Sequence, residues 1–278
     1  MILVADSGST KTTWAMAGSV DKIITEGLNP HFTTDEVFLA TCSAVRHHFQ
    51  QRHPTIYFYG AGCGNASQRK RVKQLLENGF DSTDIYVETD MLGACRAVSS
   101  HKASLVGILG TGSNACYYNG TAIKCQPAST GYILGDKGSA NHVGRILLND
   151  YLTHRMPSKL RHLFQKRLHM SNTKLMDNVY HRPNANRFLA SLAPFAVDHQ
   201  EDDDYCNGVI WASLCDWRSD TLQYLLQHSY CHADTINIVG GFAKAIEPTL
   251  RRFFNNDVLT VGTIMADPIE GLLAFHAE

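Results

Sequence analysis

The residues best suited to chemistry lie at the start of the chain, where an apolar run at positions 2–5 leads into D-S-G-S-T-K at 6–11. This turn offers one carboxylate, several hydroxyls and backbone N–H groups, which are the groups that bind a nucleotide phosphate and its metal ion. It lacks the G-x-x-x-x-G-K-[ST] spacing of a P-loop. A plain β-hairpin turn between residues 2–5 and 14–17 explains the same pattern equally well. The turn alone leaves both interpretations open.

The composition is that of an ordinary globular protein, and 278 residues suffice for about two domains. The formal net charge is −1 and the pI is about 6.9, so no basic surface is expected to hold nucleic acid or an anionic membrane. No apolar stretch reaches the length of a membrane span, and the N-terminus lacks the pattern of a secretion signal. We therefore expect a cytoplasmic protein whose partners are small molecules.

The eight cysteines and fourteen histidines are scattered along the chain. No cysteine pair has C-x-x-C spacing, and the histidines show no H-E-x-x-H motif. Several cysteines lie inside apolar runs, where a reduced thiol acts as a small hydrophobic group. We expect buried free thiols and no zinc site.

Apolar strands that end in turns of glycine and hydroxyl residues recur along the chain. After the first two strands, we expect strands at 55–59, 85–90, 104–109, 115–118 and 235–239, and helices at 34–51, 67–78, 91–98, 240–244 and 267–275. Residues 142–235 are expected to be mainly helical. The order strand, turn, strand occurs near the start and again at 104–118, which predicts two similar halves facing a cleft.

The glycine-containing turns at 6–13, 110–113 and 240–241 resemble, in their order, the phosphate-1, phosphate-2 and adenosine segments of the sugar kinase, Hsp70 and actin superfamily. Within it, the chain is similar to the N-acetylglucosamine kinase and BadF/BadG/BcrA/BcrD ATPase family. The shared motifs are D-S-G-S-T-K-T at 6–12, L-N-P at 28–30, T-D-M-L-G-A at 89–94, G-T-G-S at 110–113 and G-Y-I-L-G-D-K-G-S-A at 131–140. The last is the most specific, because N-acetylglucosamine kinases show G-D-x-G-S at this point.

The resemblance implies an α/β fold class with two similar ribonuclease H-like α/β domains, the actin-like ATPase fold, around a central nucleotide cleft. The N-terminal domain would comprise residues 1–100 and be completed by a C-terminal helix at 267–278. The second domain would comprise residues 101–266, with a helical insertion at about 142–235.

The resemblance also implies ATP and Mg²⁺ as cofactors. Asp6 would hold Mg²⁺ through water, as magnesium at a phosphate keeps several waters. Thr10 and Lys11 would face the β- and γ-phosphates, although Lys11 could equally face solvent. Where many relatives have glycines, Ser7 and Ser9 would add hydroxyls near the phosphates. The complete nucleotide set is Asp6, Gly8, Ser9, Thr10, Lys11, Gly110, Thr111, Gly112, Ser113, Gly240, Gly241 and Ala243.

For the acceptor, the resemblance implies Asp90 as the catalytic residue that accepts the proton of a sugar C6 hydroxyl. From the residues alone, Asp90 could equally be a helix N-cap. Asp136 could equally cap a helix starting near Ser139. Carboxylates and amides read hexose hydroxyls with paired hydrogen bonds. The implied sugar contacts are Asn29, Asp90, Gly131, Tyr132 and Asp136.

The expected function is therefore an ATP-dependent kinase that phosphorylates the C6 hydroxyl of N-acetylglucosamine or N-acetylmuramate in amino-sugar salvage. The alternative within the family is an ATPase that activates a 2-hydroxyacyl-CoA dehydratase or benzoyl-CoA reductase through a cysteine-held [4Fe–4S] cluster. The scattered cysteines disfavour it. A nucleotide-dependent binding module is a third hypothesis, disfavoured by the sugar set. Family members are often dimers, yet no residue here identifies an interface.

Overall fold

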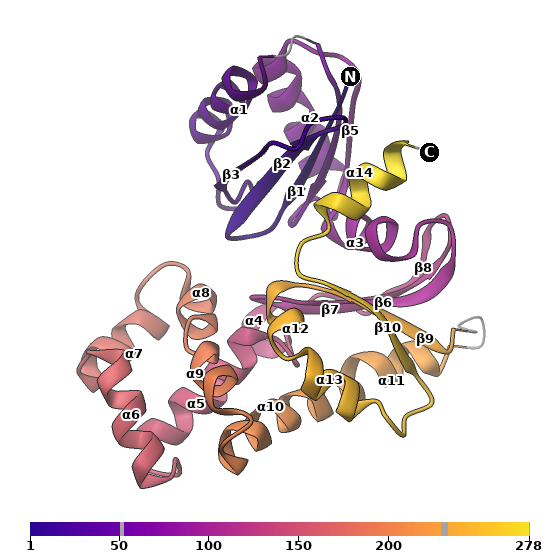
Figure 1. Cartoon of the computed structure of the whole chain (residues 1–278). Helices are drawn as coiled ribbons and strands as arrows, with labels where there is room; N and C mark the ends of the chain where they lie inside the picture. The colour runs from indigo at the N-terminus through magenta and orange to yellow at the C-terminus, as the bar shows by residue number, and fades with distance from the viewer. Residues whose placement is uncertain (51–52, 229–232, 278) are drawn as a thin grey trace. The chain divides into compact units, whose positions relative to one another are not determined.

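The computed structural model describes residues 1–50, 53–228 and 233–277 and divides into two compact units (Figure 1). Unit 1 contains residues 1–102 and 119–123 together with the C-terminal segment from Asp267 onward. Unit 2 contains residues 103–118 and 124–266. Each unit has a five-stranded sheet of its own.

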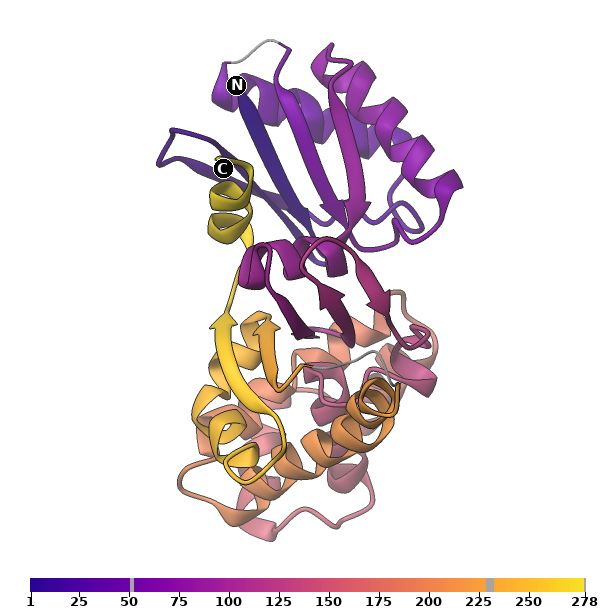
Figure 2. The same cartoon turned by 90° about the vertical axis from the view of Figure 1, so that its right-hand side faces the viewer.

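The sheet of unit 1 has the strand order β3-β2-β1-β4-β5. The strands are β1 (Ile2–Ser7), β2 (Lys11–Met16), β3 (Lys22–Glu26), β4 (Thr55–Gly60) and β5 (Ile85–Thr89). β1 and β2 are antiparallel, as are β2 and β3, whereas β1, β4 and β5 run parallel. The three parallel strands therefore end at the same edge, as their arrowheads in Figure 2 show. β3 was not predicted, because it has only two apolar residues, the adjacent Ile23 and Ile24, between charged and polar ones.

Helices cover both faces of this sheet (Figure 1). α1 (Asp35–Phe49) and α2 (Ala66–Phe80) pack on one face, with Leu3 and Ala5 of β1 in their core. α3 (Asp90–Ser99) and α14 (Ile269–Ala277) pack on the other, where Val4 contributes. This alternation follows from the two-residue period of a strand. The end of the helix predicted for 34–51 falls on Gln51, which lies outside the described residues.

The sheet of unit 2 has the strand order β10-β9-β6-β7-β8. Its strands are β6 (Ala103–Leu109), β7 (Ser113–Asn119), β8 (Ile123–Cys125), β9 (Thr235–Val239) and β10 (Thr260–Met265). β9 runs parallel to both β6 and β10. β6, β7 and β9 lie where they were predicted, whereas β8 and β10 were not predicted.

Most of unit 2 outside this sheet is helical, as predicted for residues 142–235, of which 229–232 lie outside the described residues. The helices are α4 (Gly131–Leu134), α5 (Ala140–Leu152), α6 (Ser158–Leu168), α7 (Asn172–Tyr180), α8 (Ala185–Ala190), α9 (Ala193–His199), α10 (Asp204–Trp217), the π-helical turn η1 (Arg218–Leu222), α11 (Gln223–Leu226), α12 (Gly241–Ala245) and α13 (Glu247–Phe253). The core of unit 2 joins α5, α6, α9 and α10 to β6 and β9. Within the described ranges, none of the helices has the length and apolar character needed to cross a bilayer.

Candidate functional site

The residues after Asp6 form the turn of a β-hairpin. Asp6 is paired with Thr13 across β1 and β2, and the Gly8 N–H donates to the Lys11 carbonyl at 3.0 Å. Gly8 and Ser9 are half-buried, while Thr10 and Lys11 are exposed at the tip. The hairpin interpretation of the sequence is therefore correct, and it leaves the turn accessible to a ligand.

Two buried hydroxyls fix the base of this hairpin. The hydroxyl oxygens of Ser7 and Thr12 lie 2.9 Å apart, and both accept from the Leu28 N–H, at 3.1 and 3.2 Å. Ser7 is completely buried. The expectation that Ser7 places a hydroxyl near the phosphates is thus wrong, because its hydroxyl is used inside the hairpin.

Asp90 is the first residue of α3 and directly follows β5. The N-cap of this helix is Thr89, whose hydroxyl accepts from the Leu92 N–H at 3.2 Å. The interpretation of Asp90 as the cap is therefore wrong. One carboxylate oxygen of Asp90 accepts from the Met91 N–H at 2.9 Å.

Asp6 and Asp90 lie at the carboxyl ends of two parallel strands, and their charges interact. The pKa of Asp6 is raised to about 8, chiefly by burial and also by the negative charges of Asp267 and Asp90, while Lys11 lowers it. Burial also raises the pKa of Asp90, against the lowering effect of its backbone hydrogen bonds. Carboxylates with raised pKa values in one place are typical of functional sites.

Asp267 joins this group and was missed as a site residue. It accepts from the Lys11 ammonium at 2.9 Å, from the Thr13 hydroxyl at 3.0 Å and from the Ile269 N–H at 3.1 Å. The sequence gives only the signal of an Asp-Pro pair that begins a helix. Lys11, about half exposed, is therefore paired with a carboxylate at the start of α14.

Asn29 is buried, with 7% of its surface exposed. Its side-chain oxygen accepts from the His31 N–H at 3.0 Å. A Cβ on Gly62, at φ +86°, would lie 2.4 Å from this oxygen, so only glycine allows the contact. This contact engages the oxygen of Asn29, while its Nδ2 group carries two N–H donors.

In unit 2, the loop Gly110–Ser113 between β6 and β7 is bound to the start of α5. The Ala140 N–H donates to the Gly110 carbonyl and the Asn141 N–H to the Thr111 carbonyl, at 3.0 and 3.1 Å. The Ser113 hydroxyl donates to the Lys137 carbonyl at 2.5 Å. The predicted loop at 110–113 is therefore held by hydrogen bonds to the end of the decapeptide at 131–140 and to the start of α5.

The Asp136 carboxylate lies against this loop. One oxygen accepts from the Ser113 N–H at 3.2 Å and the other from the Asn141 side chain at 2.9 Å. A Cβ on Gly112 would lie 2.9 Å from the carboxylate. α5 is capped by Ser139, whose hydroxyl accepts from the His142 N–H, so the interpretation of Asp136 as its cap is wrong.

Gly131 and Tyr132 form the first turn of α4. Gly131 is exposed with φ +69°, whereas Tyr132 is half-buried and packs against the core of unit 2. The guanidinium of Arg145, on α5, donates to the Tyr132 carbonyl at 2.6 Å. This turn is therefore tied to the same helix that holds the Gly110–Ser113 loop.

The turn after β9 begins with Gly240 at φ +138°. A Cβ there would lie 2.2 Å from the Leu109 carbonyl oxygen, so a side chain would push the turn away from β6. Gly241 has open space beside it. Ala243 is completely buried in the core, and its side chain therefore supports the turn without reaching a ligand.

The described residues contain no group of three or more His, Cys, Asp or Glu side chains arranged to hold a metal ion. Among them, six cysteines that form no disulfide are buried and Cys215 is exposed, while Cys231 lies outside the described residues. The expected buried cysteines without a disulfide are thus confirmed for those six. The half-buried Asp6 carboxylate beside a turn of hydroxyls and N–H groups fits a hydrated Mg²⁺ whose other ligands are phosphate oxygens.

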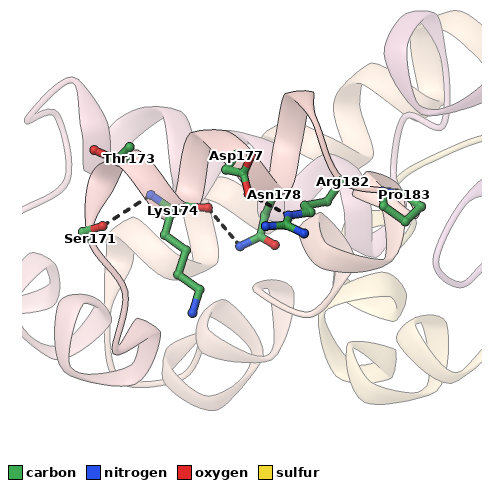
Figure 3. Close-up of a pocket in the computed structure, with 7 residues that line it drawn as sticks. All are labelled: Ser171, Thr173, Lys174, Asp177, Asn178, Arg182 and Pro183. Carbon is green, nitrogen blue, oxygen red and sulfur yellow. Dashed lines mark hydrogen bonds and ion pairs between the residues drawn. The ribbon is translucent and has the colours of Figure 1, made fainter.

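Two surface hollows lie elsewhere. One has a volume of about 750 Å³ and lies in unit 2, where Asp177 pairs with Arg182 at 2.7 Å. Figure 3 shows the side chains that line it. Its lining is Ser171, Thr173, Lys174, Asp177, Asn178, Arg182 and Pro183. The other, of about 480 Å³, lies at the end of α1 in unit 1. Neither contains a predicted site residue.

Comparison with solved structures found relatives that match nearly the whole chain. A candidate N-acetylglucosamine kinase from Porphyromonas gingivalis is 32% identical with a TM-score of 0.91, covering 99% of this chain and 98% of that chain. A second candidate N-acetylglucosamine kinase, from Chromobacterium violaceum, is 17% identical with a TM-score of 0.76 and the same coverage. MreB5 of Spiroplasma citri, bound to ADP, is 9% identical with a TM-score of 0.53, covering 99% and 94%.

Comparison with protein-family models found no match, and comparison with curated proteins found none either. The two distant structures share the fold alone, which confirms the predicted actin-like ATPase fold. An identity of 32% over almost all of both chains shows membership of the same family. The chain therefore belongs to the N-acetylglucosamine kinase family of sugar kinases with the actin-like ATPase fold.

Proposed function

We propose that this chain is a cytoplasmic ATP-dependent kinase that phosphorylates the C6 hydroxyl of N-acetylglucosamine or N-acetylmuramate in amino-sugar salvage. The observation that carries the proposal is the pair of interacting carboxylates, Asp6 and Asp90, at one edge of the parallel strands. The name of the P. gingivalis relative supports an amino-sugar acceptor. The ADP bound to MreB5 supports an adenine nucleotide as donor.

Asp90 is the proposed catalytic residue. One of its oxygens is held by the Met91 N–H, and the other would accept from the acceptor hydroxyl. Burial raises the pKa of Asp90, which makes its carboxylate a stronger base. Asp90 takes the proton of the C6 hydroxyl as O6 bonds to the γ-phosphorus, and the bond from this phosphorus to the β–γ bridging oxygen breaks to release ADP.

Asp6 is the proposed residue that holds magnesium through water. When bound, the ion supplies positive charge that neutralises the phosphate oxygens. Asp6 would hold the hydrated ion in its ionised form, which Asp267 and Asp90 disfavour and Lys11 favours. The pairing of Asp6 with Thr13 fixes the backbone from which this carboxylate extends.

The remaining nucleotide contacts belong to three turns. Ser9, Thr10 and Lys11 would donate to phosphate oxygens from the hairpin, with Gly8 allowing close backbone approach. The ion pair between Lys11 and Asp267 is half-exposed, so its exchange for a phosphate costs little. In unit 2, the proposed contacts are Gly110, Thr111, Gly112 and Ser113 for phosphate, and Gly240 and Gly241 for adenosine.

The proposed sugar contacts are Asn29, Asp90, Gly131, Tyr132 and Asp136. Asn29 offers donors, whereas Asp90 and Asp136 offer acceptors, so the proposed set contains partners for a hydroxyl that donates and for one that accepts. A site built from paired hydrogen bonds rejects analogues that lack a hydroxyl, because its polar groups would be left unpaired. A homodimer is the assembly that we propose from the family.

The test is ADP release with Mg-ATP and a panel of hexoses, N-acetylhexosamines and N-acetylmuramate. Phosphorus NMR of the product identifies the phosphorylated position, and 6-deoxy-N-acetylglucosamine is the matched control that lacks the acceptor oxygen. We expect turnover with an N-acetylated sugar and none with its 6-deoxy analogue. If no amino sugar raises ADP production above the rate with ATP alone, the proposed function is wrong.

A further inference from the structure

Two adjacent polar residues, Asn141 and His142, are buried in the first turn of α5, with 0% and 3% of their surfaces exposed. Buried polar groups cost stability unless they are hydrogen-bonded. Neither residue belongs to the predicted site. Both, however, contact the segment that carries Asp136.

The Asn141 side chain connects two parts of the candidate site. Its Nδ2 donates to the Thr111 carbonyl at 2.6 Å and to the Asp136 carboxylate at 2.9 Å. Because both partners are acceptors, the orientation of this amide is fixed. Its oxygen has no hydrogen-bond partner within the described part of the chain, so the role of the side chain lies in these two donated bonds.

His142 contacts the segment 136–138 through the backbone of Gly138. Its Nδ1 lies 2.8 Å from the Ser213 hydroxyl and 3.3 Å from the Gly138 N–H, and its Nε2 lies 3.5 Å from the Asp216 carboxylate. Burial lowers the pKa of His142 to about 4, helped by Arg145 and Lys137 and opposed by Asp220. The ring is therefore neutral near pH 7, with Nδ1 accepting and the proton on Nε2.

We infer that Asn141 and His142 are positioning residues that fix the Asp136 carboxylate against the Gly110–Ser113 loop. Asp136 has a left-handed backbone, with φ +53°, and its carboxylate spans from the Ser113 N–H to Asn141. The inference rests on the proposed function, in which Asp136 binds a sugar hydroxyl.

The first variant is Asn141→Leu, which keeps the shape of the side chain and removes both donated bonds; Asn141→Ala is the second. The exposed Asn149 of the same helix gives the control Asn149→Leu. We expect the KM for sugar to rise about 10-fold or more, as for loss of a hydrogen bond to a charged group. The KM for ATP should change less than about threefold, because the backbone bond from Asn141 to Thr111 remains.

A double-mutant cycle separates positioning from general stability. In an Asp136→Ala background, Asn141→Leu should leave the sugar KM unchanged within about twofold, because its effect acts through the missing carboxylate. His142→Phe, which keeps ring volume, should raise the sugar KM in the wild-type background, whereas His162→Phe at an exposed position of α6 should not. Additive effects in the cycle would overturn the inference.

Amide hydrogen exchange at Ser113 provides a readout without catalysis. We expect exchange about 10-fold faster in Asn141→Leu and in Asn141→Ala, since the Asp136 acceptor loses its anchor. Unchanged Ser113 exchange in both variants would overturn the inference. If wild-type protein phosphorylates no sugar, the proposed function fails, and the exchange result still decides whether Asn141 positions Asp136.

Discussion

Replacing Asp6 by Asn is expected to stabilise the nucleotide-free and metal-free protein at high pH. The pKa of Asp6 is raised to about 8, first by burial and then by the charges of Asp267 and Asp90, while Lys11 lowers it. The folded state therefore binds the Asp6 proton more tightly than the unfolded state does. Stability from this group is full below pH 3.8, declines as pH rises from 3.8 to about 8, and is lost above that.

The loss of unfolding free energy caused by ionised Asp6 follows from the shift of its pKa. Each pKa unit corresponds to about 1.36 kcal/mol, so a change from 3.8 to about 8 sets an upper limit near 6 kcal/mol. Because the effective dielectric around protein charges is higher than that of a dry interior, we expect the measured effect to be a fraction of this limit, about 2 kcal/mol. For a chain of this size, that corresponds to a shift of about 4 to 8 °C in the unfolding temperature.

The assay is scanning calorimetry of wild type and Asp6→Asn in EDTA between pH 5 and 9. The wild-type unfolding temperature should fall relative to that of the variant as pH rises, because Asn mimics the protonated acid. Asp21→Asn, at an exposed turn, is the control and should follow wild type. Parallel pH profiles for Asp6→Asn and wild type would refute the electrostatic reasoning.

Three further predictions follow from single contacts. Asp90→Asn should lower kcat about 10²- to 10⁴-fold while the ATP dissociation constant from calorimetry stays within about threefold, and near-normal turnover would exclude Asp90 as the base. Gly271→Ala would place a Cβ 2.3 Å from the Ala97 carbonyl oxygen, so urea unfolding should show a loss of about 2 kcal/mol, whereas Gly208→Ala, with open space in α10, should gain about 0.5 kcal/mol. Lys11→Met should change stability by less than about 1 kcal/mol, because its ion pair is half-exposed, yet raise the KM for ATP about 10-fold in steady-state kinetics. An unchanged KM would remove Lys11 from the phosphate contacts.

The strands that could be predicted are those whose signal is local. The apolar runs before Asp6, Gly60 and Gly110 each end at a turn, and each forms a strand. β3 was missed because its exposed and half-buried residues alternate, so that Ile24 faces outward with 63% exposure. β10 was missed because Gly262 interrupts it where the pairing register shifts. Neither β3 nor β10 has a sequence pattern typical of a strand, and each is recognised only by its pairing with the neighbouring strand.

The sequence by itself determined where the hairpin at Asp6, the carboxylate at Asp90 and the glycine turns occur, because a strand, its turn and the next helix are specified by neighbouring residues. Only the tertiary structure decided what these groups contact. Lys11 meets Asp267 across 256 positions of sequence, and Asn141 meets Asp136 only because the Gly110–Ser113 loop binds the start of α5. Such pairings depend on how sheets and helices pack, and no local pattern encodes them.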